Sequence, residues 1–501
     1  MGIETEYGIT TPGRTTMNAM AASSDVVTAY GRHGMPPGRR MASWDYDREN
    51  PLRDARGYDM SISEADPSQL TNEDLGLANV ILTNGGRLYV DHAHPEYSTP
   101  EVTNPRDAVL WDRCGVEIMR RAMDWVAASP GSNPVVLYKN NTDNKGVSYG
   151  CHENYLVRRT TPFADLVRHL IPFFISRQII TGTGRVGLGQ DGRLPGFQLS
   201  QRADFFEVDV GLETTLKRPI INTRDEPHAD PEKWRRLHVI VGDANLSDVA
   251  TYLKVGTTAI VLSMIEDGWL DSVDWLPLHP VPEMHAVSHD PSLRHRIELS
   301  GGRRWTAVEL QFEILALARD YCARRSQDPD PEQTNDVLST WQRVLESLSQ
   351  EPMRLASELD WVAKYRLMNG YIARDHLTWD APTLAAIDLQ YSDIRPDKGL
   401  ALRLEKSGHL NRMTTDVEVS RAVHEPPTDT RAYFRGECIR RFPESVSAAS
   451  WDSIVLDVPS RQSLMRVPTI DPWRGTRSHV GTLLADSSDV DSLVRALEAS
   501  A

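Results

Sequence analysis

The sequence has only four cysteines among its 501 residues, and none of them forms a CxxC pair. This scarcity argues against a disulfide framework and against a cysteine-ligated zinc site, so we expect reduced thiols. Long apolar runs are also missing, because no stretch approaches the roughly 18 residues of a membrane-spanning helix. No secretory signal is visible either. The sequence therefore predicts a cytoplasmic protein with no membrane partner.

Positive charge is scarce as well. The 55 Lys and Arg residues are outnumbered by 70 Asp and Glu residues, and the formal net charge is -15. A general nucleic-acid-binding protein shows a basic footprint, so we expect no nucleic-acid partner. The GxSxG elbow of serine hydrolases and the HExxH motif of zinc peptidases are both missing. The glycine-rich segment 181–189 lacks the Lys-Ser/Thr pair of a P-loop and is predicted to be a flexible loop.

The chain is long enough for two domains. Apolar spacing predicts helices over 14–30, 106–128, 247–266, 307–325, 335–349 and 355–373. Short strands are predicted over 1–9, 135–138, 147–156, 205–210 and 453–458, and a last helix from about residue 489. Residues 34–75 lack periodicity and predict a long loop, a feature that is usually functional or disordered. The character of the sequence changes after residues 425–428. This change predicts a catalytic domain over 1–428 and a small domain over 429–501.

The segment 84–97 carries the strongest functional signal. Its Asn-Gly-Gly start is typical of a tight hairpin turn. In the following strand, alternation places Arg87, Tyr89 and Asp91 on one face and apolar residues on the other. Glu96 follows within reach, after a proline that stiffens the chain. A cation, a phenol and a carboxylate in one row indicate a strand face that looks into a polar site.

The N-terminal strand shows a similar pattern. Alternation places Glu4 and Glu6 on the same face. Two neighbouring carboxylates repel each other unless they lie in solvent or share a cation. Magnesium suits them, because it prefers oxygen ligands and often joins protein carboxylates to substrate phosphates. Either strand alone could be a solvated edge, but the two together favour a metal–nucleotide site.

Further polar residues could complete such a site. On the predicted strand 147–156, His152 and Asn154 share one face, and Glu153 lies on the other. We interpret His152 or Glu153 as a metal ligand, although a single His is more often structural. His238, at the entry of an apolar strand, is a candidate ligand or phosphate contact.

Arginines supply the candidate anion contacts. Arg202 and Arg224 each stand among hydrogen-bonding residues, and the planar guanidinium matches phosphate and carboxylate oxygens. Either residue could instead be a surface arginine paired with a nearby acid. Arg435 and Trp451, at the start of the C-terminal segment, could hold a nucleotide base or form a domain interface.

Four motifs, at 2–8, 87–97, 150–155 and 431–437, together resemble the Pup ligase/deamidase family, whose core is shared with glutamine synthetase and the carboxylate–amine ligases. The resemblance covers essentially the whole chain. The loop residues Trp44-Asp45-Tyr46 and 49–59 resemble the deamidase branch of that family, because the ligase branch lacks such a loop. The Asp-His-Ala-His sequence at 91–94 resembles the same branch.

The resemblance implies an α+β fold, with a curved antiparallel cradle of glutamine synthetase type flanked by helices, and a small C-terminal domain. It implies ATP, or ADP with phosphate, as a cofactor that is not consumed, together with Mg. The implied partners are Pup, a small acidic disordered protein that would fold on binding in a groove, and pupylated proteins. A monomer is expected.

The resemblance also implies roles for individual residues. Asp91 would be the catalytic carboxylate, acting as a nucleophile or as a general base. The set implied near magnesium is Glu4, Glu6, Tyr89 and Glu96, with His152 and His238 as further candidates. The residues implied near the nucleotide are Arg87, Thr99, Asn154, Arg435 and Trp451, and Arg202 and Arg224 could neutralise phosphate or a developing oxyanion.

The expected reaction is hydrolysis of a side-chain amide: deamidation of the C-terminal Gln of Pup to Glu, and cleavage of Pup–lysine isopeptide bonds. Three alternatives remain open at this point. The chain could be a Pup–protein ligase that consumes ATP, a carboxylate–amine ligase acting on small amino acids, or a non-catalytic Pup-binding depot.

Overall fold

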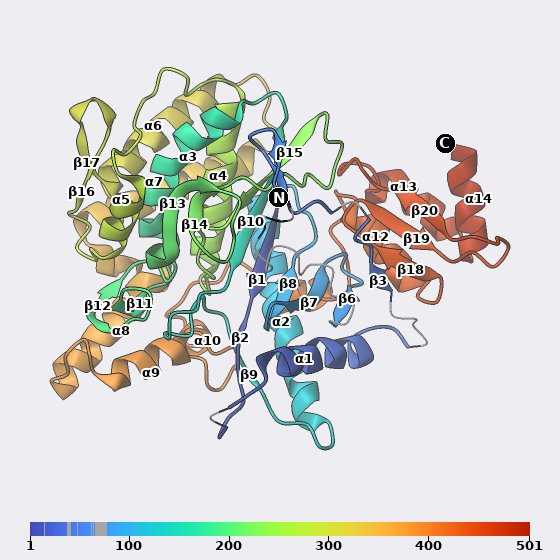
Figure 1. Cartoon of the computed structure of the whole chain (residues 1–501), viewed down its shortest axis with the longest axis horizontal. Helices are drawn as coiled ribbons and strands as arrows, with labels where there is room; N and C mark the ends of the chain where they lie inside the picture. The colour runs from blue at the N-terminus through green and yellow to red at the C-terminus, as the bar shows by residue number, and fades with distance from the viewer. Residues whose placement is uncertain are drawn as a thin grey trace.

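The structure is a computed structural model that describes residues 1–14, 16–37, 42–47, 49–61, 63, 65 and 78–500. Its centre is a six-stranded sheet in the order β15-β10-β1-β8-β7-β6, in which all neighbouring strands are antiparallel (Figure 1). The strands are β1 (Gly2–Glu6), β6 (Asn79–Ile81), β7 (Arg87–Asp91), β8 (His94–Ser98), β10 (Cys151–Arg158) and β15 (Trp234–Val239). The predicted α+β class with an antiparallel sheet is confirmed.

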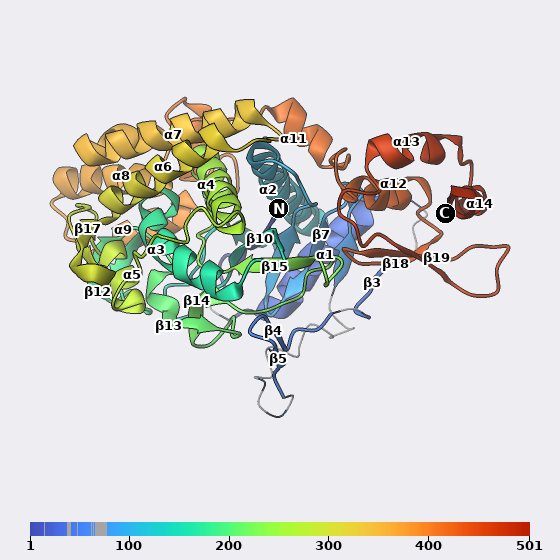
Figure 2. The same ribbon diagram turned by 90° about the horizontal axis from the view of Figure 1, so that it is seen from above.

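Helices cover one face of this sheet. The nearest are α1 (Ala19–His33), α2 (Pro105–Ala128) and α4 (Asp248–Glu266), and around α4 pack α3 (Phe163–Thr181), α6 (Ala307–Arg324) and α7 (Pro331–Gln350). Figure 2 shows α2, α4, α6 and α7 on one side of the sheet and two short strand pairs on the other side, β4 (Arg53–Asp54) with β5 (Tyr58–Asp59) and β13 (Phe206–Gly211) with β14 (Arg218–Asn222). Polar side chains on the sheet face away from the helices are therefore free to build a site.

The predicted helices are found with shifted ends. The helix predicted from residue 14 begins only at Ala19, where the Asn18 side chain caps it by accepting a hydrogen bond from the Ala21 amide. The helix predicted from 355 begins at Asp360, because residues 352–357 form a 3-10 helix instead. The α4 helix is long and apolar enough to cross a membrane, but 89% of its most apolar 18-residue stretch is buried inside the protein. Its apolar surface is thus already used in packing.

The hairpin predicted at 84–86 connects β6 to β7. Gly85 has a φ of 81°, which glycine adopts readily and other residues rarely do. A Cβ at this position would lie 2.7 Å from the carbonyl oxygen of Ala432 in the C-terminal segment. Glycine is therefore required both by the turn and by the close approach of a distant part of the chain.

The long loop contributes to two small sheets. Its described residues form β3 (Ser43–Trp44), β4 (Arg53–Asp54) and β5 (Tyr58–Asp59). The β3 strand pairs in parallel with β18 (Val446–Ala449), and so joins a four-stranded sheet in the order β20-β19-β18-β3. Residues 38–41, 48, 62, 64 and 66–75 of the predicted loop lie outside the described part of the chain. The domain boundary at 428/429 stays a prediction.

The rest of the C-terminal segment comprises β19 (Ser453–Leu456), β20 (Met465–Pro468), α12 (Ala432–Arg441), α13 (Arg477–Asp486) and α14 (Val490–Ser500). The other strands are β2 (Gly8–Thr10), β9 (Val136–Tyr138), β11 (Arg185–Leu188), β12 (Leu194–Gln198), β13 (Phe206–Gly211), β14 (Arg218–Asn222), β16 (Arg296–Glu298) and β17 (Arg304–Thr306). The remaining helices are α5 (Pro280–Ser288), α8 (Asp360–Asp375), α9 (Pro382–Tyr391), α10 (Leu400–Lys406) and α11 (Asp416–Ala422).

One local prediction is wrong. The segment 181–189 is not a flexible loop, because residues 185–188 form β11, which pairs with β12. Its glycines serve the hairpin geometry: at Gly187, φ is 91° and a Cβ would lie 2.2 Å from the Gly192 carbonyl oxygen.

Candidate active site

Strand register gathers the predicted acids on the sheet face that the helices leave open. The β1–β8 pairing sets Glu6 opposite Glu96, and the β7–β8 pairing sets Tyr89 opposite the same Glu96. On its other side, β1 sets Glu4 opposite His152 of β10. Directly opposed residues on one face have Cβ atoms about 4.5–5.5 Å apart. The alternation read from the sequence thus becomes a cluster of polar groups from four strands.

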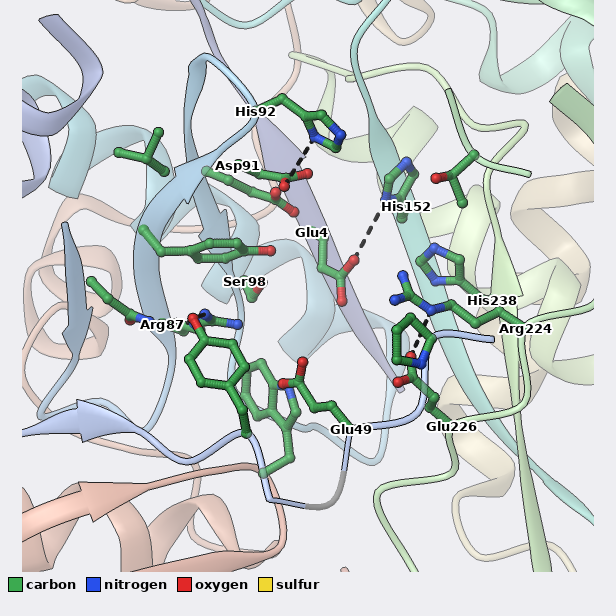
Figure 3. A pocket seen from close by; sticks show the side chains of 18 of the residues that line it. Glu4, Glu49, Arg87, Asp91, His92, Ser98, His152, Arg224, Glu226 and His238 are labelled. Atoms are coloured by element: carbon green, nitrogen blue, oxygen red, sulfur yellow. Dashed lines mark hydrogen bonds and ion pairs between the residues drawn. The ribbon is translucent and has the colours of Figure 1, made fainter. Parts of the chain in front are cut away.

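All of these groups except Glu6 line a cavity of about 420 Å³, here called the acidic cavity (Figure 3). The predicted site residues on its wall are Glu4, Arg87, Tyr89, Asp91, Glu96, His152, Arg224, His238 and Trp451. They come from the central sheet, from the segment after β14 and from the C-terminal segment. A second cavity of about 820 Å³, here called the adjoining cavity, shares Glu4 and Trp451 with it and is lined also by Thr99 and Asn154.

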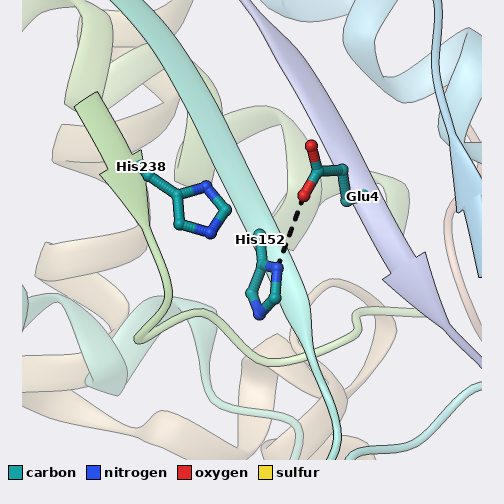
Figure 4. Close-up of side chains that lie close together, drawn as sticks. All are labelled: Glu4, His152 and His238. Carbon is teal, nitrogen blue, oxygen red and sulfur yellow. Dashed lines mark ion pairs between the residues drawn. The ribbon is translucent and has the colours of Figure 1, made fainter. Parts of the chain in front are cut away.

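One group of side chains with metal-binding character is Glu4, His152 and His238 (Figure 4). A Glu4 oxygen lies 3.4 Å from His152 Nδ1, and potential ligand atoms of the three residues lie within 4.8 Å of one another. Burial and the nearby charge of Arg236 hold the pKa of His238 well below its usual range. A neutral imidazole is the form that binds metal. Burial alone would raise the pKa of Glu4, but the hydrogen bond from His152 and the charge of Arg236 outweigh it and lower that pKa.

A second group brings together the carboxylates of Glu6, Asp91 and Glu96, also within 4.8 Å of one another. Burial and the negative charges of Asp91 and Glu6 raise the pKa of Glu96 well above its usual range. One Glu96 oxygen, Oε2, is buried and has no hydrogen-bond partner among the described residues. Such crowded, underpartnered oxygens fit a hard divalent cation such as magnesium, which would offset their repulsion.

Glu6 is held more firmly than its neighbours. It accepts a hydrogen bond of 2.6 Å from the Gly150 amide, and its other oxygen lies 3.2 Å from His94 Nδ1. Burial opposes ionisation of Glu6. The hydrogen bond and charge of His94, the charge of His152 and the Gly150 hydrogen bond outweigh burial and lower the pKa of Glu6 to about 2. Glu6 is therefore a fixed carboxylate beneath the acidic cavity.

Asp91 is the most open of the three carboxylates, with a side chain that is 25% exposed against 9% for Glu6. It ends β7, and its Oδ1 lies 3.0 Å from His92 Nδ1. Among the described residues it has no ion pair with Lys or Arg. It is the acid with the greatest freedom to reach a substrate atom.

Aromatic rings hold Arg87 at the end of the cavity. Its guanidinium lies 3.9 Å from the ring centre of Trp44 and 3.9 Å from that of Tyr89, at distances that favour cation–π attraction. Trp44 in turn meets Trp451 edge-on, with ring centres 5.3 Å apart, and donates a 2.6 Å hydrogen bond to Glu49. The long loop and the C-terminal segment therefore meet at Arg87.

Sequence reasoning missed a second ionic layer on the opposite wall. Arg224 Nε lies 2.6 Å from Glu226, and Arg236 reaches the same carboxylate at 3.3 Å. Arg236 also donates a 2.8 Å hydrogen bond to Asn154, whose amide donates to Glu4. The pattern could have been found, because Arg236 alternates with His238 on one strand face and Glu226 follows Arg224 at the same interval.

Four predicted nucleotide contacts lie outside the acidic cavity: Asn154, which lines the adjoining cavity, and Thr99, Arg202 and Arg435. The Thr99 hydroxyl accepts a 3.0 Å hydrogen bond from the Ile3 amide. Arg202 is 1% exposed, and its Nε and Nη1 have no hydrogen-bond partner among the described residues. Arg435 is buried against Glu101, the Gly85 carbonyl and the Trp451 carbonyl, so its guanidinium joins the C-terminal segment to the β6–β7 turn.

The interpretation of Glu153 as a metal ligand is wrong. Its carboxylate lies on the helix-covered face and is fully buried against Arg177, with contacts of 2.7 and 2.8 Å. The Tyr155 hydroxyl donates a further 2.7 Å hydrogen bond to it. Because side chains alternate along a strand, Glu153 points to the opposite face of the sheet from His152. Arg177 of α3 donates to both oxygens of the Glu153 carboxylate.

A protein-family profile described as "Pup-ligase protein" matches residues 1–455. The chain is 62% identical over 497 residues to a protein named Depupylase from Acidothermus cellulolyticus, covering 99% of this chain and 98% of that one. It is 53% identical over 500 residues to a protein named Pup deamidase/depupylase from Mycolicibacterium smegmatis, with the same coverages. A Pup–protein ligase from Nakamurella multipartita is 37% identical over 490 residues, covering 97% of this chain and 98% of that one.

Two solved structures have a similar fold. The crystal structure of the ligase PafA in complex with Pup has a TM-score of 0.78 and 31% identity, covering all of this chain and 92% of that one. The structure of the Pup ligase PafA in complex with ADP has a TM-score of 0.72 and 35% identity, covering 81% of this chain and 89% of that one.

Proposed function

Because the chain belongs to the Pup ligase family, we propose that it acts on Pup as a nucleotide-dependent amidohydrolase with the glutamine synthetase-like fold. It deamidates the C-terminal Gln of Pup to Glu and cleaves the isopeptide bond between Pup and a substrate lysine. The observation that carries this choice is the pattern of similarity. Identity is 62% and 53% to relatives named for depupylation or deamidation, against 37% to a Pup–protein ligase.

Asp91 is the proposed catalytic residue. Both reactions break a bond between the same γ-carbonyl carbon and a nitrogen. Asp91 could attack that carbon and form an anhydride that water opens, or take a proton from the attacking water. Its position at the end of β7, its exposure and its lack of an Arg or Lys partner within the described chain support this role.

The proposed magnesium ligands come from Glu4, Glu6, Tyr89, Glu96, His152 and His238. Their support is the crowding of carboxylates around Glu96 and the histidines beside Glu4. Magnesium would supply positive charge, and together with the phosphates of bound ATP, or of ADP with phosphate, it would supply electrostatic order at the reacting carbonyl. Arg87, Thr99, Asn154 and Trp451 line the two cavities in positions that suit a nucleotide.

The three other arginines have two proposed roles. Arg224, on the cavity wall, suits phosphate or a developing oxyanion, and the unpartnered nitrogens of Arg202 suit the same task from beneath. Arg435 would act by holding the Trp451 segment in place.

We further propose that the enzyme is cytoplasmic, with Pup and pupylated proteins as its partners, and that it works as a monomer. Four free cysteines support the compartment.

Incubation with ATP, magnesium and Pup ending in Gln tests the function. We expect ammonia release with little ADP formed. ADP formation in step with conjugation of Pup to lysine would indicate the ligase instead. Tight binding of Pup with no turnover on any substrate would indicate a depot.

A further inference from the structure

His92 follows Asp91 directly and lines the acidic cavity (Figure 3). Its φ is 52°, in the left-handed region that residues other than glycine rarely adopt. In this conformation His92 Nδ1 lies 3.0 Å from Asp91 Oδ1, and the His92 side chain stays 35% exposed. Unusual backbone conformations of this kind cluster at functional sites.

The other ring nitrogen of His92 has no task within the described chain. Nε2 is buried and has no hydrogen-bond partner among the described residues. A buried polar atom without a partner is rare and needs an explanation, of which a catalytic role is one.

The charges around His92 favour its protonated form. Asp91 accepts from it, and Glu6 adds a second negative charge, whereas burial and Arg218 act in the opposite direction. The balance raises the pKa of His92 to about 9. An imidazolium with one N–H on Asp91 and the other unpartnered is therefore the expected form at neutral pH.

We infer that His92 is a second catalytic residue: the acid that protonates the leaving nitrogen of the amide. The inference rests on the proposed amidohydrolase function and deepens it. An amine leaves an acyl carbon readily only if it gains a proton as the carbon–nitrogen bond breaks. Ammonia and the lysine amine are both strongly basic leaving groups that need a proton as they depart, so one acid serves both substrates.

The proton balance closes with water as the only other reactant. As the carbon–nitrogen bond breaks, the nitrogen keeps the electron pair and takes the Nε2 proton, which leaves His92 neutral. If Asp91 has activated the attacking water, it releases the proton it took to solvent, and Nε2, the ring nitrogen that does not face Asp91, takes up one proton from solvent, so the two residues gain and lose none overall. If Asp91 has formed an anhydride, the water that opens it supplies the proton to Nε2.

Leaving-group dependence tests this role. We would compare His92→Asn with the unaltered chain on Pup joined through its C-terminal γ-carboxyl to lysine or to an aminocoumarin. Asn is chosen because it tolerates the left-handed conformation. The aminocoumarin is weakly basic and leaves without protonation. We expect a loss of about 100-fold on the lysine isopeptide, within the range for general acid catalysis, and of less than about 10-fold on the aminocoumarin amide.

The matched control is His376→Asn. His376 is exposed, lies outside the lining of both cavities and has a φ of 53°, so it reports on the same backbone change. The ratio of the two losses does not depend on the amount of folded protein. Equal losses on both substrates would overturn the inference and leave His92 as a residue that only positions Asp91. No loss on the isopeptide would also overturn it. Failure of the unaltered chain on both substrates would instead reject the proposed function, and the inference with it.

Discussion

Asp91 differs from the acids around it in what it touches. Glu6 is fixed by the Gly150 amide and by His94, whereas Asp91 contacts His92 and is partly exposed. A carboxylate that is already engaged has little freedom to act on a carbonyl carbon. The division of labour among three adjacent acids therefore follows from their partners.

Asp91→Asn tests that division. Asn keeps the shape of the side chain but is neither a nucleophile nor a base, so we expect deamidation to fall by at least about 1,000-fold. Pup binding, measured by fluorescence anisotropy, should change by less than about threefold. Asp397→Asn, at an exposed position outside both cavity linings, is the control and should keep full activity. Normal ammonia release from Asp91→Asn would remove Asp91 from the mechanism.

Strands were easier to predict than the contacts of the loop. The alternation of 87–91 was enough to place Arg87, Tyr89 and Asp91 on one face, because period two is a property of any extended chain. The pairing of β3 with β18 joins residues about 400 positions apart, and no local pattern encodes it. The role of Trp44 against Arg87 was therefore not visible in the sequence.

Trp44→Leu tests that loop contact. The loss of one of the two rings that flank Arg87 should free its guanidinium and weaken nucleotide binding by about 10-fold, in line with a cation–π contribution of about 1 kcal/mol or more. Isothermal titration with ADP and magnesium measures the change. Trp305→Leu, in a tryptophan pair with Trp275 outside both cavity linings, is the matched control. Equal affinities for the two variants would contradict a role of Trp44 in nucleotide binding.

Arg435 shows where the motif reading could not separate two roles. The sequence allowed a base contact or a domain interface, and burial decides what the guanidinium touches: Glu101 and two backbone carbonyls. The two arginines explain the charge state of Glu101, since Arg435 and Arg431 outweigh the cost of burial and lower the pKa of Glu101 to about 2.

Arg435→Met should therefore affect stability. The substitution removes one of the two arginines that pair with Glu101 and leaves the buried Gly85 and Trp451 carbonyls without the Arg435 donor, and we expect a loss of about 3–5 kcal/mol in the free energy of unfolding. Urea titration followed by tryptophan fluorescence measures it. Arg193→Met, whose side chain is 86% exposed, should cost less than about 1 kcal/mol. If the Arg435 variant were as stable as the Arg193 variant, the interface role would be rejected.

The whole molecule can be read as a scaffold that holds repelling charges together. The chain has a net charge of -15, yet it places the carboxylates of Glu6, Asp91 and Glu96 within 4.8 Å of one another on a rigid sheet. The repulsion is a cost to the fold, and a bound cation would offset it. The sequence could predict the acids of each strand, but only the register of β1, β7 and β8 reveals that they converge.

Global stability should therefore depend on magnesium and nucleotide together. At 100 times its dissociation constant, a ligand that binds only the folded state adds about 2.7 kcal/mol. We expect ATP with magnesium to raise the thermal midpoint and a chelator to reverse most of the rise. Glu96→Gln should lose much of the metal-dependent part and, because one repelling charge is gone, melt no lower than the unaltered chain without ligand. Glu313→Gln, at an exposed position of α6, should behave like the unaltered chain. An equal rise with and without magnesium would show that the acidic cluster holds no metal.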